Sequence, residues 1–103
     1  MKNFRTYQLA KDLFHTLKTV KTNGPMKDQL DRASLSIVLN LAEGSAKMGY
    51  KDRKKFFVIA MGSLRESQAI LDLLDDKVIQ AKADHLAANL HKLIQNPGPG
   101  PAA

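Results

Sequence analysis

The chain carries one set of polar residues whose types and spacing could do chemistry: Arg32, Ser36, Asn40, Glu43 and, further along, Glu66. The first four form a single polar stripe along a helix, because they follow one another at spacings of four, four and three. If the chain reverses direction near residue 49, Arg32 lies opposite Glu66, Ser36 opposite the Gly62–Ser63 pair, and Glu43 opposite Lys55. We predict a structural ion pair between Arg32 and Glu66, since a buried charge needs a partner. A charged catalytic couple is the alternative, but no nucleophile or metal-ligand pattern accompanies it.

A second candidate is a cluster of positive charge around the same reversal, with Asp52 as its one acidic residue. Its basic side chains are Lys47, Lys51, Arg53, Lys54 and Lys55. Residues 1–55 carry a net charge of +7 and residues 56–103 a net charge of −1, which together give the formal +6 of the chain. Such a cluster attracts RNA or DNA in a salt-dependent way, and Tyr50 could stack on a base. The alternatives are a solvated turn and a tyrosine that packs on the end of a bundle.

Other site chemistries lack the residues that they need. The three histidines, at positions 15, 85 and 91, have no metal-binding spacing of four between them, and the chain has no cysteine. No Gly-x-Ser-x-Gly elbow or glycine-rich phosphate loop is present. We therefore predict no catalytic residue, no metal, no cofactor and no small-molecule substrate. Because no apolar run approaches the ~18 residues of a membrane span, we expect a cytoplasmic protein that does not bind a membrane.

Four helices can position these residues, and no segment has the alternating pattern of a strand. We predict helices over residues 4–21, 26–47, 51–75 and 80–95, followed by a disordered Pro/Gly tail over residues 96–103. Short connections between helices favour antiparallel neighbours, so residues 1–95 should form an all-α, up-down-up-down four-helix bundle. The second helix is expected to be buried on most of its circumference, with Leu35 and Leu39 widening its inward face.

The third helix has a weaker second stripe away from its main apolar face: Val58, Gly62, Ala69 and Leu73. A glycine inside a helix costs about 1 kcal/mol relative to alanine, which suggests the close approach of another backbone at Gly62. That backbone could be the second helix of the same chain or a neighbouring subunit. We predict a subunit interface here, and hence a homo-oligomer.

Two linked motifs carry a resemblance to a known family. They are Arg32-x-Ser34-x-Ser36-Ile37-x-x-Asn40-x-Ala42-Glu43-Gly44 and Lys55-Phe56-Phe57-x-Ile59-Ala60-x-Gly62-Ser63-x-x-Glu66. Over residues 4–75 the chain resembles the bacterial four helix bundle protein family, which includes proteins encoded in intervening sequences of 23S ribosomal RNA genes. The resemblance implies an antiparallel four-helix bundle that assembles into a ring, a homopentamer, with no established enzymatic activity. It also brings a distant similarity to accessory proteins of diversity-generating retroelements, whose basic barrels contact nucleic acid.

Two functions therefore stay open, besides the disfavoured one of an unrecognised enzyme. The first is a non-enzymatic oligomeric helical-bundle protein that binds nucleic acid, RNA in particular, as an accessory protein. It depends on the basic cluster. The alternative is a protein-protein interaction scaffold without nucleic-acid binding, which depends on the wide apolar circumference of the second helix and on the stripe around Gly62.

Overall fold

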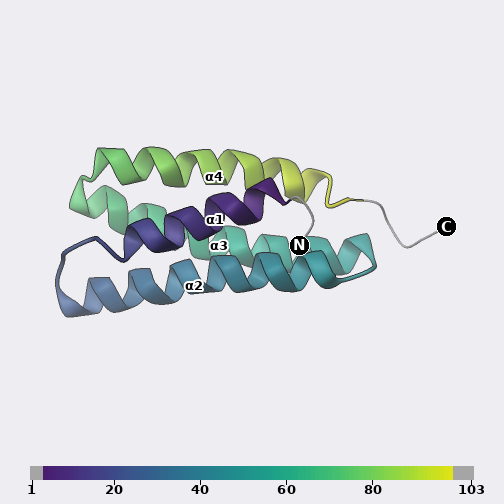
Figure 1. Cartoon of the computed structure of the whole chain (residues 1–103), viewed down its shortest axis with the longest axis horizontal. Coiled ribbons are helices and arrows are strands. Elements are labelled where there is room, and N and C mark those ends of the chain that lie inside the picture. The colour runs from purple at the N-terminus through teal and green to yellow at the C-terminus, as the bar shows by residue number, and fades with distance from the viewer. Residues whose placement is uncertain (1–3, 99–103) are drawn as a thin grey trace.

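The computed structural model describes residues 4–98, which contain four helices and no strand. The helices are α1 (Arg5–Leu17), α2 (Gly24–Ala46), α3 (Tyr50–Leu74) and α4 (Lys77–Gln95). Successive helices run in opposite directions, so the all-α, up-down-up-down four-helix bundle is confirmed (Figure 1). Each helix packs against the next one along the chain, and α4 packs against α1. Consequently α2 and α3 each have a side that neither α1 nor α4 covers.

Local side-chain hydrogen bonds set the beginnings of two helices. At α2, the Asn23 side chain accepts a hydrogen bond of 2.9 Å from the backbone N–H of Met26, and Pro25 lies in the first turn. At α4, Oδ1 of Asp76 accepts one of 3.0 Å from the backbone N–H of Ile79. Each bond satisfies a backbone donor that the helix leaves unpaired.

Two predicted helix ends are wrong by three or four residues. α1 ends at Leu17 instead of residue 21, because Nζ of Lys27 donates hydrogen bonds to the carbonyl groups of Leu17 and Lys18 at 2.9 and 3.0 Å. α4 begins at Lys77 instead of residue 80. Asp75 ends α3 in the left-handed conformation, with φ of 57°, and Asp76 caps α4 at once. The turn therefore needs neither the glycine nor the proline that would have marked it in the sequence.

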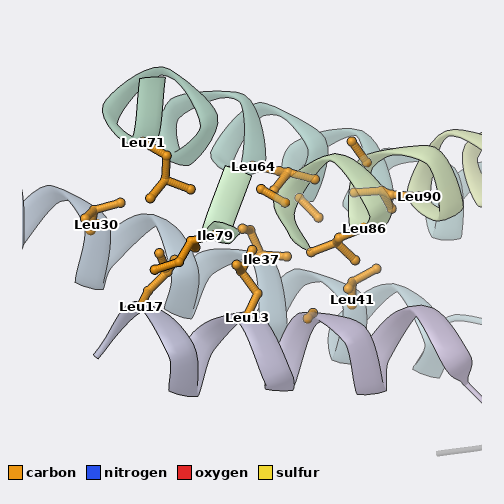
Figure 2. Close-up of a cluster of buried hydrophobic side chains, with 14 of the residues drawn as sticks. Leu13, Leu17, Leu30, Ile37, Leu41, Leu64, Leu71, Ile79, Leu86 and Leu90 are labelled. Atoms are coloured by element: carbon orange, nitrogen blue, oxygen red, sulfur yellow. The ribbon is translucent and has the colours of Figure 1, made fainter. Parts of the chain in front are cut away.

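The core lies where the inward sides of the four helices meet (Figure 2). Every helix contributes aliphatic side chains to it, such as Leu13 from α1, Ile37 from α2, Leu64 from α3 and Leu86 from α4, each at most 1% exposed. Burial of this kind contributes roughly 1.5–3 kcal/mol for each large side chain. The bundle therefore has a continuous apolar core along its length.

α2 and α3 approach each other closely at Gly44, near the turn that joins them. A Cβ atom added at Gly44 would lie only 2.7 Å from Cε1 of Phe57, whose side chain is fully buried. Phe57 in turn contacts Phe4 edge to face, with ring centroids 6.3 Å apart. Gly44 is thus required for the close approach of the two helices.

The predicted tail begins near this same turn, at the end of the bundle where α4 ends (Figure 1). Residues 96–98 are not helical, and the Pro97 carbonyl accepts a hydrogen bond of 3.5 Å from Nη1 of Arg53. The remaining tail residues, 99–103, lie outside the described residues, so the disorder predicted for them stays a prediction. No helix among residues 4–98 is sufficiently long and apolar to cross a bilayer.

Candidate interaction surfaces

The uncovered side of the α2–α3 pair brings together most residues that the sequence singled out. We call it the outer face. It consists of Arg32, Leu35, Ser36, Leu39, Asn40 and Glu43 from α2 and of Lys55, Val58, Ile59, Gly62, Ser63 and Glu66 from α3. All of them are exposed or half-buried. Ala69 and Leu73 continue the α3 side toward the turn between α3 and α4, and both are exposed.

A short polar seam runs along the middle of the outer face. The hydroxyl oxygens of Ser36 and Ser63 lie 2.8 Å apart, and Nδ2 of Asn40 donates to the Ser36 carbonyl at 2.9 Å and to its hydroxyl at 3.1 Å. Ser36 was predicted to lie opposite the Gly62–Ser63 pair, and the structure shows that its partner within that pair is Ser63. All three side chains are half-buried, so the stripe lies at the edge of the helix contact and not in the core.

The predicted ion pair between Arg32 and Glu66 is wrong for the single chain. Oε2 of Glu66 accepts a hydrogen bond of 2.8 Å from Nε2 of Gln29, and no ion pair involving Arg32 occurs within residues 4–98. Glu43 likewise pairs with Lys47, at 3.0 Å, and not with Lys55. The physical reason is exposure: both Arg32 and Glu66 face solvent, so neither charge requires a partner. Gln29, one helical turn before Arg32, was the signal that the sequence offered for the observed bond.

Large apolar side chains flank the seam on both helices. Leu35 and Leu39 of α2 are 45% and 56% exposed, and Val58 and Ile59 of α3 are 49% and 43% exposed. The expectation that Leu35 and Leu39 widen the inward face of α2 is thus wrong, because no other helix of this chain covers that side. The outer face is an apolar surface with a polar seam and charged margins.

Gly62 lies open on this surface. A Cβ atom added there would meet nothing within 4 Å, so α2 is not the backbone that the glycine accommodates. Of the two explanations that the sequence left, the subunit interface remains, and it stays a prediction. Leu73, which belongs to the same predicted stripe, is 76% exposed.

The basic cluster lies at the end of the α2–α3 pair where the two helices are joined, and we call it the basic tip. Two of its members have contacts within the chain. Nε of Arg53 donates to the Lys47 carbonyl at 2.8 Å, which fastens the turn, and Lys47 itself pairs with Glu43. Nζ of Lys47 also lies 5.3 Å from the centre of the Phe56 ring. The sequence did not indicate these contacts. They hold both side chains against the protein while the Arg53 guanidinium keeps its charge.

Three lysines of the cluster remain directed to solvent: Lys51, Lys54 and Lys55. All are exposed, and none takes part in an ion pair within the part of the chain that the structure describes. Tyr50, in the first turn of α3, is 44% exposed beside them. The opposite end of the bundle carries both signs: Asp72, Asp75 and Asp76 lie there, as do Lys18, Lys21 and Lys27, and Lys77 pairs with Asp75 at 2.9 Å.

The histidine and acidic side chains of residues 4–98 do not gather into a metal-binding group. No group of three histidine, aspartate or glutamate side chains there could hold a metal ion. Nε2 of His85 lies 3.4 Å from Nη2 of Arg5 on the exposed surface, and His15 packs edge to face on Phe14.

The model of one protein family matches residues 2–96, and that family is described as 23S rRNA-intervening sequence protein. The match spans all four helices and both motifs around Arg32 and Gly62. The chain belongs to this family. No curated protein and no solved structure matches it. In this family member the outer face and the basic tip adjoin, because Lys55 lies on the margin of one and within the other.

Proposed function

We propose that this family member is a non-enzymatic subunit that associates with copies of itself through the outer face. The observation that carries the proposal is the exposure of Leu35, Leu39, Val58 and Ile59 on one side of α2 and α3. Monomeric proteins rarely leave a contiguous apolar surface of this kind uncovered. Covering it would remove apolar area from water, which contributes about 25 cal/mol for each Å².

The polar groups of the outer face favour a protein partner that covers them without losing hydrogen bonds. Ser36, Asn40 and Ser63 already bond to one another, so burying the seam leaves few groups unsatisfied. The charged margins carry both signs in equal number, Arg32 and Lys55 against Glu43 and Glu66. A surface of balanced charge can fit a second copy of itself, whereas a strongly charged partner would gain little from it.

The test is the mass of the protein in solution, measured by sedimentation equilibrium. We expect the chain to be larger than a monomer and the variant Leu39→Glu to be monomeric and still helical, since a half-exposed side chain is not needed for folding. Val78→Glu on α4, where the native side chain is 73% exposed away from the outer face, is the matched control and should keep the native mass. A native chain that stays monomeric at every accessible concentration would exclude self-association.

We propose, as a second function, that the basic tip binds RNA. Its support is the set of exposed lysines without ion pairs, Lys51, Lys54 and Lys55, beside the half-exposed ring of Tyr50. Lysines that approach phosphates release condensed counterions, and an aromatic ring can stack on an unpaired base.

Fluorescence anisotropy of a labelled, structured RNA over a range of salt concentrations tests this second function. Binding should weaken with salt at a slope of about 0.7–0.9 for each phosphate contacted. Lys51→Glu combined with Lys54→Glu should abolish binding, whereas the same double reversal at Lys18 and Lys21, at the other end of the bundle, should weaken it much less. Equal binding by the native chain and the tip variant would rule the basic tip out as the RNA site.

A further inference from the structure

Four charged residues at the margins of the outer face form a regular pattern. We call them the corner charges: Arg32 and Glu43 on α2, Lys55 and Glu66 on α3. Each pair is separated by eleven positions, or three helical turns, so its members lie on the same side of their helix and roughly 16 Å apart. Because α2 and α3 are antiparallel, Arg32 lies level with Glu66 and Glu43 lies level with Lys55. The sign thus alternates around the four corners.

The corner charges are poorly matched within the subunit. Arg32 and Lys55 take part in none of the ion pairs found in residues 4–98, and Glu66 bonds only to the neutral amide of Gln29. Glu43 alone has an opposite charge, Lys47, one turn away on its own helix. A surface that carries alternating charges without pairing them internally is complementary to another copy of the same surface.

The apolar side chains of the outer face share this register. The contact between Ser36 and Ser63 fixes the relative height of the two helices. Leu35 precedes Ser36 by one residue and Leu39 follows it by three, whereas Gly62 precedes Ser63 by one. Gly62 of α3 therefore lies at a height between the two leucines of α2, and its surface is open because a Cβ atom there would meet nothing within 4 Å. Two bulky side chains on one helix match a gap on the other.

We infer that a second copy docks in parallel, with α2 of one subunit against α3 of its neighbour at the same height. This inference rests on the proposed self-association. In this register Leu35 and Leu39 of one subunit lie on either side of Gly62 in the neighbour. Arg32 pairs with Glu66 across the interface, and Glu43 pairs with Lys55. The ion pair that is absent from the single chain thus forms between two chains.

Antiparallel docking of α2 on α2 would also match charges, since Arg32 could then meet Glu43 of the other copy. In that register, however, the two copies of α2 are related by a two-fold axis that passes midway between residues 32 and 43. This register brings Leu35 level with Asn40 of the other copy and Leu39 level with Ser36. The bulky apolar side chains of α2 would then face the polar seam, and the same symmetry on α3 would bring Ile59 level with Gly62 of the other copy. The parallel register alone pairs the corner charges and also places the two leucines of α2 against Gly62 instead of against polar side chains.

Charge exchange distinguishes the two registers. Sedimentation equilibrium gives the dissociation constant of the native chain, of the single variants Arg32→Glu and Glu66→Arg, and of two double variants. We expect each single reversal to weaken association at least about tenfold, because it places like charges together. Arg32→Glu with Glu66→Arg should restore association to within about threefold of native. Arg32→Glu with Glu43→Arg should remain weak. Circular dichroism checks that every variant keeps its helices.

Each other outcome overturns a defined part of the inference. Restoration by Arg32→Glu with Glu43→Arg would establish the antiparallel register and reject the parallel one. A native chain that associates, together with single reversals that leave its dissociation constant unchanged, would reject the corner charges while self-association through the outer face stands. A native chain that is monomeric throughout would reject self-association itself.

Discussion

The two sides of the α2–α3 pair contain the same kinds of residue in opposite surroundings. On the inner side Leu30, Ile37 and Leu64 are almost completely buried beneath α1 and α4, whereas Leu35 and Leu39 on the outer side remain half-exposed. Neither composition nor helix propensity explains this difference, since leucine occurs on both sides. It arises from the number of helices available in one chain. An apolar stripe therefore indicates that this side of a helix is buried, but it does not indicate whether the same chain or another chain buries it.

The glycines within the two helices repeat this contrast at single positions. Gly44 on the inner side lies against the ring of Phe57, and any side chain there would collide with it. Gly62 on the outer side has open space above it. The first glycine is explained by contacts inside the subunit, and the second has no such explanation. Substitutions that compare the two sides can test this assignment directly.

The largest expected difference concerns the leucines. Leu64→Ala should lower the free energy of unfolding by about 2–5 kcal/mol, because it opens a cavity in the packed core. Leu39→Ala should change the stability of the dissociated subunit by less than about 1 kcal/mol, since the side chain is already half in water. Urea unfolding at a protein concentration where the chain is monomeric measures both. A loss for Leu39→Ala as large as that for Leu64→Ala would mean that the outer face is part of the subunit core.

The next difference concerns the glycines. Gly44→Ala should destabilise the subunit by about 1–3 kcal/mol, because the added methyl group must displace the buried ring of Phe57. Gly62→Ala should stabilise the dissociated subunit by up to about 1 kcal/mol, since alanine favours the helix and meets no obstacle. Thermal unfolding followed by circular dichroism at high dilution gives both values. If both glycines tolerate alanine equally, the close contact at Gly44 is not needed for the fold.

Hydrophobic periodicity predicted the four helices and the bundle because it reports which sides of each helix are apolar. It failed at the α1 end, where Lys27 of the next helix supplies a cap from outside the local sequence, and at Asp75, whose left-handed conformation replaces a glycine. It also failed for Leu35 and Leu39. Periodicity cannot distinguish an apolar residue covered by its own chain from one that awaits another chain.

The polar residues of the candidate surfaces were predicted with similar limits. The antiparallel register placed Ser36 opposite the Gly62–Ser63 pair, which contains its observed partner Ser63, because helix geometry fixes heights to within about a residue. The register alone could not show which of several partners at the same height a long side chain bonds to. Glu66 selects Gln29 and not Arg32, and Arg53 fastens the turn at Lys47 instead of projecting into solvent. Such choices depend on exposure and rotamers that spacing alone does not specify.

A smaller effect is expected from the polar seam that separates the two sides. Ser36→Ala should cost about 1 kcal/mol, since it removes a half-buried hydrogen bond and leaves the Ser63 hydroxyl without this partner. A double-mutant cycle with Ser63→Ala, followed by urea unfolding, should give a coupling energy of about 0.5–1.5 kcal/mol. Additive effects of the two substitutions would mean that the 2.8 Å contact does not stabilise the subunit.

The smallest expected effect is also the sharpest check on the charges of the outer face. Arg32→Gln should change the stability of the dissociated subunit by less than about 0.5 kcal/mol, because Arg32 is exposed and has no ion pair inside residues 4–98. A buried pair with Glu66 would instead make its loss cost about 3–5 kcal/mol. The same variant should weaken self-association if Arg32 pairs with a neighbouring chain. Urea unfolding at high dilution and sedimentation equilibrium on one protein preparation thus separate a charge that stabilises the fold from one that acts only between subunits.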